Sequence, residues 1–583
     1  MTAIIASSLR FDIVVSGGSL SAPAAALAAA RNAPNAKVLL IEPTDWLGGQ
    51  ATSQGVSAID NAWFDPGRTA MAEDPDGHYA KDYLQWLRRM NDPGVPGTGM
   101  SKNGTSWVSR EAFDPRSAAW VLDRMIEEQP NITLMKLTVV KNVETRDGRI
   151  SALTLIERIP TQNYKPFDDY LSDEIQDWYS SSHSRRFAKV VHRVEPADFQ
   201  QGFTVIDASE LADVVALSGA EYTQGAELET EEVDGRGNLP ATDDRASQAT
   251  VFVFCMTDAE QEHSENELKR HWPNFDSYYA EQEKSYFSLR QFSWEKVWTY
   301  RRLKTEGKLH DFDAVHRGDV SMQNWEPGND YPYASFLRDH AATAAQARGD
   351  WQGGVDRAVL AKCEEHAIAW YFWMKAHRPT AWDTTLPHGD HPLNMMGTRH
   401  GLAKFPYVRC ARRIVGPNNF RILERHWKNS QAPDYDGRPA HRFYDSIGIG
   451  SYAADVHPIR NQRGMKPGFE RPAPFYIPYR ALVSKNVGNL MACGKNMAQT
   501  FITNSAYRLH PIEWASGSAA GAAAGLLHTT NAARKTTHGP DYFLHTPEAL
   551  RKLQGVVKEN SPIGWKAWND SEYPETPFEP FVP

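Results

Sequence analysis

The chain has 583 residues, 41% hydrophobic and 23% charged, which is the composition of a globular protein and excludes a disordered or fibrous one. Lysine and arginine number 63 against 72 aspartates and glutamates, so the formal net charge is -9, and the absence of a long basic run excludes an obvious nucleic-acid reader. The four cysteines, at 255, 363, 410 and 493, have no metal-like spacing and make no disulfide framework.

The amino-terminal residues and the apolar tracts bear on location. Residues 1–15 lack a basic start and a cleavage site and run straight into a predicted strand, so we expect no signal peptide. The longest apolar tracts, near 22–30 and 515–527, are shorter than the roughly 20 residues that a bilayer span needs. We therefore expect no membrane span and a reducing, cytoplasmic location.

The first fifty residues have the pattern of a β-α-β unit. Residues 11–15 are a β-rich apolar run of the kind that is buried on both faces in a parallel sheet. A turn of small residues follows at 16–21, and the alanine-rich stretch 22–31 predicts a helix. A second predicted strand, 38–41, ends at Glu42.

The next part of the chain is less regular. Residues 131–156 predict short strands around the turn Asp147-Gly148, which is a hairpin signal. The stretch 157–203 is polar and aromatic without a clear period, which predicts an excursion from the main fold. A buried strand is predicted at 203–207.

The carboxyl-terminal half contains segments rich in Trp, Pro and His between 230 and 475, with one strong helical segment at about 354–375. A strand at 489–493 and an Ala/Gly-rich helix at 512–526 end the regular part. The sequence shows no internal repeat and no low-complexity linker, so we expect interleaved domains.

The turn at 17–22, Gly-Gly-Ser-Leu-Ser-Ala, stands where a dinucleotide fingerprint is expected. Glycine permits a tight turn, small side chains let the main chain approach a pyrophosphate, and the helix N-terminus offers N–H groups. Ser19 and Ala22 replace the second and third glycines, so the match is degenerate. Glu42 is placed to accept both hydroxyls of an adenosine ribose. The alternative is an ordinary β-α-β turn with a surface glutamate.

The following segment, 42–53, reads Glu-Pro-Thr-Asp-Trp-Leu-Gly-Gly-Gln-Ala-Thr-Ser. With the turn at 17–22 it resembles the FAD-dependent oxidoreductases of the glutathione-reductase-like superfamily, in the group with the motif E-P-T-x-x-L-G-G-x-x-T-S. Further blocks that resemble this group lie at 205–209, 324–331, 407–416, 445–457, 477–496 and 508–521. The sequence departs from the group at Ser209-Glu210-Leu211, where glycines are usual, and at Cys410, where an acid is common.

The resemblance implies FAD, rather than NAD, and an α/β fold: a discontinuous Rossmann-like FAD-binding domain with an inserted α+β substrate domain. The boundaries that we predict are 1–62, 115–225 and 476–530 for the FAD-binding domain, 63–114 and 226–475 for the substrate or cap domain, and 531–583 for a C-terminal extension. The predicted cofactor-binding residues are Gly17, Gly18, Ser19, Ser21, Ala22, Glu42, Pro43, Gly48, Gly49, Gln50, Thr52, Ser53, Val140, Asp207, Gly494, Asn496 and Pro511.

The sequence lacks two features of the flavoproteins that take electrons from pyridine nucleotides. There is no CxxxxC redox pair, and the nearest second fingerprint, 448–453, is not followed by a helical pattern. Electrons are therefore expected from a small organic substrate, oxidised by hydride transfer to flavin N5, with the electron acceptor open. The alternatives are a monooxygenase or halogenase reduced by NAD(P)H or a partner reductase, and a flavin-bearing subunit of a larger complex.

His457 is our first candidate for exchanging the substrate proton, and His510 is the second, because histidine titrates near neutral pH. Tyr452 and Arg412 complete the predicted catalytic set. The start of the 512–526 helix is expected to stabilise reduced flavin. Lys495 is expected to be a solvated surface residue.

Two further groups have alternative readings. Arg409, Arg412 and Arg413 fit a carboxylate substrate or internal ion pairs. Aromatic residues that fit a substrate wall or ordinary core packing are Trp63, Trp325, Trp382 and Tyr452. The His/Asp group Asp383, His388, Asp390 and His391 has no trusted metal spacing, so we predict no metal.

Overall fold

The computed structural model describes residues 4–5, 8–59, 79–101, 105–227, 243–259, 266–269, 271–286, 293–379, 382–427, 441–452, 454–457, 469–470 and 475–564. Its main sheet has five parallel strands in the order β22-β9-β3-β4-β5. These are β22 (Leu490–Ala492), β9 (Thr204–Asp207), β3 (Ile13–Ser16), β4 (Val38–Ile41) and β5 (Ile132–Met135). The first four are buried along their whole length, which explains their continuous apolar sequences.

Two long helices pack against each other beside this sheet, α1 (Ser21–Asn32) and α13 (His510–Arg534). A Cβ on Gly517 would lie 2.2 Å from the oxygen of Ser21, and one on Gly521 would lie 2.0 Å from that of Ala25. The Ala/Gly-rich composition therefore permits close backbone contact between the helices. α13 continues past residue 530, where we predicted a domain boundary.

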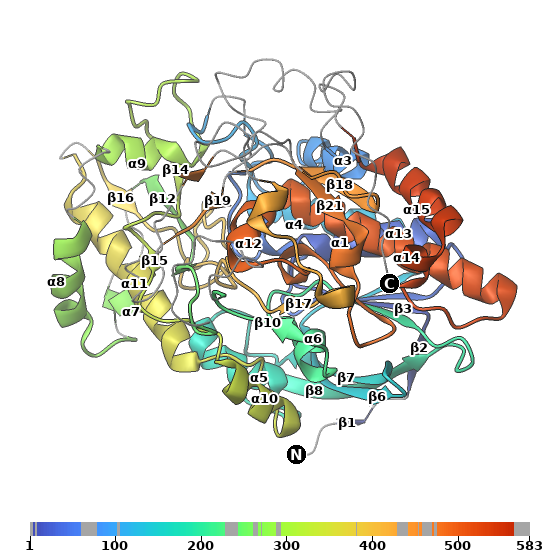
Figure 1. Cartoon of the computed structure of the whole chain (residues 1–583). Helices are drawn as coiled ribbons and strands as arrows, with labels where there is room; N and C mark the ends of the chain where they lie inside the picture. Colours follow the sequence, from blue (N-terminus) through green and yellow to red (C-terminus); the bar gives the residue numbers. More distant parts are fainter. Residues whose placement is uncertain are drawn as a thin grey trace.

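Further helices surround this pair, and Figure 1 shows the C-terminal ones on the right. They are α3 (Lys81–Arg89), α4 (Pro115–Glu127), α14 (Tyr542–His545) and α15 (Pro547–Asn560). The α4 helix begins at Pro115 after Asp114, whose side chain accepts from the N–H of Arg116 and so caps the helix.

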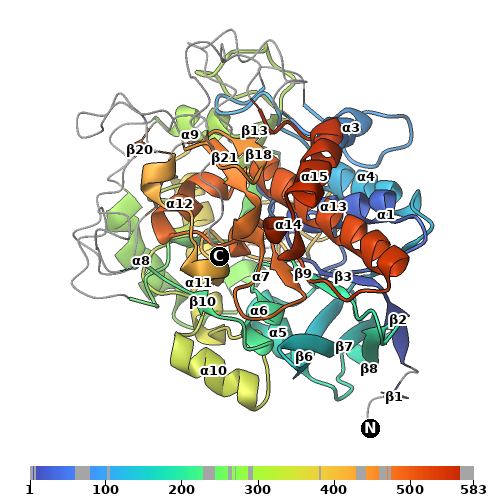
Figure 2. The ribbon, with the colours of Figure 1, turned by 45° about the vertical axis from the view of Figure 1, so that its right-hand side comes forward.

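A second sheet lies below the first in Figure 2. Its strands are β6 (Thr138–Arg146), β7 (Arg149–Pro160), β8 (Phe187–Pro196), β2 (Leu9–Phe11) and β1 (Ile4–Ile5). β6, β7 and β8 are antiparallel, whereas β1 and β2 run parallel to β8. The predicted hairpin is confirmed: Asp147 and Gly148, both with positive φ, join β6 to β7.

The predicted excursion at 157–203 is wrong where the chain belongs to the second sheet. It contains the end of β7, the helix α5 (Leu171–Tyr179) and all of β8. β8 is half-buried, with nearly alternating buried and partly exposed residues, so its polar side chains obscured a strand that pairs with β7.

The middle of the chain forms an α+β unit that we call the cap, on the left of Figure 1. Its antiparallel sheet has the order β13 (Arg302–Lys304), β14 (Val320–Gln323), β12 (Phe254–Asp258) and β16 (Thr384–Thr385). Its helices are α7 (Asn266–Lys269), α8 (Phe275–Tyr286), α9 (Trp294–Tyr300), α10 (His340–Arg348) and α11 (Arg357–Ala376). α11 confirms the helix predicted at 354–375, and several tryptophans fill the core around it.

Short strand pairs and two small helices connect the parts. The pairs are β10 (Tyr222–Thr223) with β17 (Arg413–Ile414), β11 (Thr250–Val251) with β15 (Asp330–Tyr331), β18 (Ser446–Gly450) with β21 (Phe475–Pro478), and β19 (Ala454–Asp455) with β20 (Phe469–Glu470). The helices are α6 (Asp213–Leu217) and α12 (Phe501–Tyr507). The whole is a mixed α/β fold, as predicted, with the parallel sheet at its centre.

Candidate active site

Two glycine-rich loops meet beyond the carboxyl ends of β3 and β4. Gly17 leaves no room for a side chain, because a Cβ would lie 2.2 Å from the oxygen of Ile41. Gly49 lies equally close to the first loop, with its Cβ position 2.5 Å from the oxygen of Gly18. Gly18, Gly48 and Gly49 all have positive φ, which favours glycine. The two predicted loops therefore form one structure, which we call the cradle.

The serines of the first loop stabilise it internally. Ser19 Oγ lies 2.6 Å from Ser21 Oγ and donates to the oxygen of Ala208 at 2.7 Å. The N–H of Leu20, at the amino end of α1, donates to Glu513 Oε2 at 3.2 Å. This helix N–H is thus engaged within the protein, as is the N–H of Gly17, which donates to the oxygen of Ile41 at 2.8 Å.

Glu42 is fully buried at the end of β4. Its Oε1 accepts hydrogen bonds from the N–H and the hydroxyl of Thr44, at 2.9 and 2.8 Å, whereas Oε2 has no hydrogen-bond partner among the described residues. Burial raises the pKa of Glu42 to about 8. A buried acceptor without a donor fits the predicted contact with ribose hydroxyls, which supply donors.

A hollow of about 320 Å³, which opens partly to solvent, lies against these loops. Gly17, Gly18, Pro43 and Ser53 from the predicted cofactor set line it. The cradle, the unpaired Glu42 oxygen and the hollow together fit the ADP half of FAD.

Other predicted cofactor residues hold the loops in place. Thr52 Oγ1 donates to the oxygen of Leu47 at 2.6 Å. Asn496 Nδ2 donates to Asp207 Oδ1 at 3.3 Å and to the oxygen of Ser209 at 2.6 Å. Asp207 and Asn496 therefore fix the loop that follows β9, beside the hollow.

Four further residues of that set are Gly494, Ala22, Val140 and Pro511. The N–H of Gly494 donates to Ser516 Oγ at 3.0 Å, and Ala22 is buried in the first turn of α1. Val140 is buried in β6, and Pro511 lies in the first turn of α13. Their contact with FAD stays a prediction.

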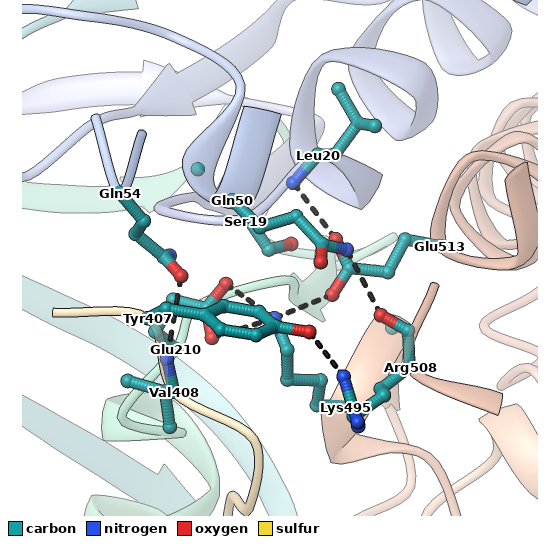
Figure 3. Close-up of polar contacts among 12 residues, drawn as sticks. Ser19, Leu20, Gln50, Gln54, Glu210, Tyr407, Val408, Lys495, Arg508 and Glu513 are labelled. Carbon is teal, nitrogen blue, oxygen red and sulfur yellow. Dashed lines mark hydrogen bonds and ion pairs between the residues drawn. The ribbon is translucent and has the colours of Figure 1, made fainter. Parts of the chain in front are cut away.

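The expectation that Lys495 is solvated is wrong. Its side chain is 1% exposed, and Nζ lies 2.8 Å from Glu210 Oε1 and 2.8 Å from Glu513 Oε1 (Figure 3). Burial lowers the pKa of Lys495, but the two carboxylates outweigh burial and raise it above its ordinary value. Burial also raises the pKa of Glu210 to about 7. We call Lys495, Glu210 and Glu513 the buried ion triad, and no local pattern in the sequence joins them.

A path of contacts leads from the cradle to His457. Gln50 Nε2 donates to the main-chain oxygen of Arg508 at 2.9 Å, and the Arg508 guanidinium donates to the hydroxyl of Tyr407 (Figure 3). Arg508 also donates to the main-chain oxygen of Asp455 at 3.1 Å. Asp455 Oδ2 in turn lies 3.1 Å from His457 Nε2.

His457 lies within a cluster of charged side chains that we call the histidine cluster. Its Nδ1 is 2.5 Å from Asp330 Oδ2 and 3.5 Å from Glu326 Oε2. Asp330 Oδ1 also accepts from Arg409 at 3.1 Å. Burial and Arg409 lower the pKa of His457, but Asp455 and Asp330 outweigh them and raise it above 6.5. These acids were inside the blocks that drew attention to His457, but their convergence was not predictable.

One side of the histidine cluster is open to solvent. The side chains of Glu326, Asp455 and His457 are 38%, 32% and 16% exposed, whereas that of Asp330 is 1% exposed. Partial burial raises the pKa of Glu326 to about 7. Tyr452 lies at this side, with its hydroxyl 3.4 Å from Asp455 Oδ2. The cluster is therefore buried at Asp330 and accessible to solvent at Glu326, Asp455 and His457.

His510 and Arg412 are engaged elsewhere. His510 Nε2 lies 2.9 Å from the oxygen of Val56, and burial lowers its pKa to about 3, so the ring is neutral. The Arg412 guanidinium donates to the oxygens of Leu211 and Gly354, the latter at 2.8 Å. Neither side chain is part of the histidine cluster, and Arg412 ties the cap to the loop after β9.

The other arginines bear out the internal-pair alternative. Arg409 pairs with Asp330, and Arg413 pairs with Glu227 at 2.9 Å. Trp63 lies outside the described residues. Trp325 is buried in the cap core and Trp382 packs against it.

Two other kinds of site, a metal site and a second nucleotide site, are considered from the positions of their candidate residues. Among the described residues, one group has ligand atoms close enough for a metal ion, namely Glu326, Asp330 and His457. Asp330 is already paired with Arg409, which supplies the positive charge there. The second fingerprint candidate, 448–453, begins in β18, which pairs with β21, and the next element that the structure describes is the strand β19.

Comparison with known proteins gives the family. The family model described as "FAD dependent oxidoreductase" matches residues 12–165 and 185–540, so the chain belongs to that family. FAD is therefore its cofactor, and the protein is an oxidoreductase. No curated protein matches the chain. Within the described part of the chain, we find no helix with the length and apolar character of a membrane span.

Solved structures with similar folds are distant flavoproteins. A quinol-fumarate reductase is 12% identical with a TM-score of 0.28, covering 95% of this chain and 75% of its own. The L-amino acid deaminase of Proteus vulgaris is 8% identical with a TM-score of 0.21, covering 44% and 56%. The myxobacterial chondrochloren halogenase is 14% identical with a TM-score of 0.19, covering 44% and 46%. None of these similarities carries a reaction over to this chain.

Proposed function

We propose that this protein oxidises a small organic substrate by hydride transfer to flavin N5, with His457 exchanging the substrate proton. The observation that supports this proposal is the continuous path of contacts from Gln50, in the cradle, through Arg508 and Asp455 to His457. FAD supplies the hydride acceptor, and the chain must supply the proton acceptor and the substrate position.

The histidine cluster suits proton exchange for a physical reason. Asp330 and Asp455 lie at the two ring nitrogens of His457, which fixes the ring and favours its protonated form. The longer contact, between Nε2 and Asp455 Oδ2 at 3.1 Å, is the one that a substrate would replace to deliver its proton. Above its raised pKa the neutral ring is able to accept a proton, so the rate should increase as pH rises above 6.5. Glu326, on the exposed rim, is placed to pass that proton to solvent.

The test is an anaerobic titration of the purified holoprotein with a panel of amines, alcohols and carboxylates, followed by absorption spectroscopy. Bleaching of the oxidised flavin spectrum by one compound, without NAD(P)H, is the expected result. Failure of every compound to bleach the flavin, together with rapid NAD(P)H oxidation, would favour the monooxygenase or halogenase alternative. Stable co-purification with a partner and no turnover alone would favour the subunit alternative.

A further inference from the structure

The family model leaves residues 166–184 of this chain unmatched. In the structure this insertion carries α5 and stands between β7 and β8. Trp178 and Tyr179, at the end of α5, line the hollow opposite Gly17 and Gly18. We propose that the insertion is a fixed wall of the cofactor site, and that Trp178 and Tyr179 are binding residues for the ADP half of FAD.

Trp178 is fastened to the loop that follows Glu42. Its Nε1 donates to Glu174 Oε1 at 2.9 Å, and the Arg158 guanidinium lies 4.1 Å from its ring centre. Arg158 also donates to the main-chain oxygen of Pro43. One buried arginine thus connects the insertion to the residue beside the predicted ribose ligand.

Tyr179 is fastened to the other loop that bounds the hollow. Its hydroxyl donates to Asp213 Oδ1 at 3.2 Å, and Asp213 is the first residue of α6, just after the loop that follows β9. Trp351 of the cap donates to the same oxygen at 2.7 Å. The end of α5 therefore spans the gap between the two loops that are expected to hold the cofactor.

The start of α5 is anchored as firmly as its end. The N–H and the hydroxyl of Ser172 donate to the carboxylate of Glu364 on α11, at 3.1 and 2.6 Å, and both residues are buried. A helix held at both ends is a wall rather than a moving flap. FAD in contact with this wall should dissociate slowly.

The chemistry of the two side chains defines what they offer the cofactor. The Trp178 N–H and the Tyr179 hydroxyl are already bonded within the protein, so the two side chains offer the hollow apolar ring atoms. Arg158 and Phe405 lie against the Trp178 ring and hold it in place. Aromatic ring atoms pack on an apolar ligand surface and exclude water from it. This inference depends on FAD binding and not on which substrate is oxidised.

The test compares the variants Trp178→Leu and Tyr179→Leu with Trp272→Leu as a matched control. Trp272 belongs to the same aromatic core but does not line the hollow. The dissociation constant and release rate of FAD are measured with apoprotein and holoprotein by flavin fluorescence. We expect FAD to bind about three- to tenfold more weakly in the first two variants and unchanged in the control.

Binding of FMN shows which part of FAD the variants affect. FMN lacks the AMP part of FAD, so its affinity should be the same in all three variants and the parent. Equal FAD affinity and release rate in Tyr179→Leu and the parent, or an equal loss for FMN and FAD, would overturn the proposal. Tyr179→Leu is a separate variant that removes the second ring, so it decides the question even where Trp178→Leu fails to fold.

Discussion

The cradle and the histidine cluster lie along one path of contacts, but the first is formed by main-chain atoms and the second by charged side chains. The cradle consists of main chain and glycines at the ends of two adjacent parallel strands, where Cβ atoms would collide with carbonyl oxygens. The histidine cluster consists of charged side chains from β15, β19 and the loops around them.

The difference shows two ways of specifying a site. The cradle depends on backbone shape, so any added atom is expected to damage it. The histidine cluster depends on balanced charge, so replacing His457, whose side chain is partly exposed, should change its chemistry while leaving the fold intact. The following variants test that distinction.

Gly17→Val should have the largest effect, a loss of bound FAD. The new Cβ would lie 2.2 Å from the backbone oxygen of Ile41, which cannot move without disturbing β4. The flavin-to-protein ratio of the purified variant measures this. Gly555→Ala is the control, because nothing lies within 4 Å of its Cβ position on α15, and it should keep its flavin. Normal flavin content in Gly17→Val would show that the backbone shape of the cradle is not essential.

His457→Gln should lower kcat by about 10²–10⁴-fold, the usual contribution of a general acid or base, while flavin content stays normal. The pH dependence of kcat/KM should lose the increase above 6.5 that the raised pKa of His457 predicts. His538→Gln, at a histidine stacked on Tyr542, is the matched control. An unchanged pH profile in His457→Gln would contradict its role as the base.

Lys495→Met should lower the free energy of unfolding by about 3–5 kcal/mol, because it leaves the carboxylates of Glu210 and Glu513 buried without their cation. Denaturant titration measures the change. Lys485→Met removes the ion pair between Lys485 and Glu221, whose side chains are 31% and 50% exposed, respectively. This variant should lower the free energy of unfolding by only about 0–1 kcal/mol. A similar decrease in the free energy of unfolding in both variants would show that the buried ion triad stabilises the fold no more than a surface ion pair does.

Glu42→Gln should change the pH dependence of apoprotein stability. The pKa of Glu42 is raised from 4.5 to about 8 on folding, so the unfolded chain loses this proton first and stability falls as pH rises from 4.5 to 8. Removing the group should flatten that fall by up to about 1.4 kcal/mol per pH unit. Thermal melts of the variant and the parent across this range test it, and parallel curves would contradict the prediction.

The cradle was predictable because its signals are local. A buried strand, a glycine turn, a helix and Glu42 follow one another within about thirty residues, and the Gly48-Gly49 motif comes next. The hairpin at Asp147-Gly148 and the α11 helix were predictable for the same reason. The half-buried strand β8 was missed because alternating polar residues hide a strand until its partner is known.

By itself, the sequence determined the β-α-β unit, the family resemblance and therefore FAD, since strand, turn and helix preferences act between neighbours. Only the tertiary structure decided that Lys495 is buried between two acids, that Asp330 and Asp455 hold His457, and that α5 closes the hollow. Charge pairing joins Lys495 to Glu210 across 285 positions and His457 to Asp330 across 127, and no local pattern records which of many acids will meet a given base.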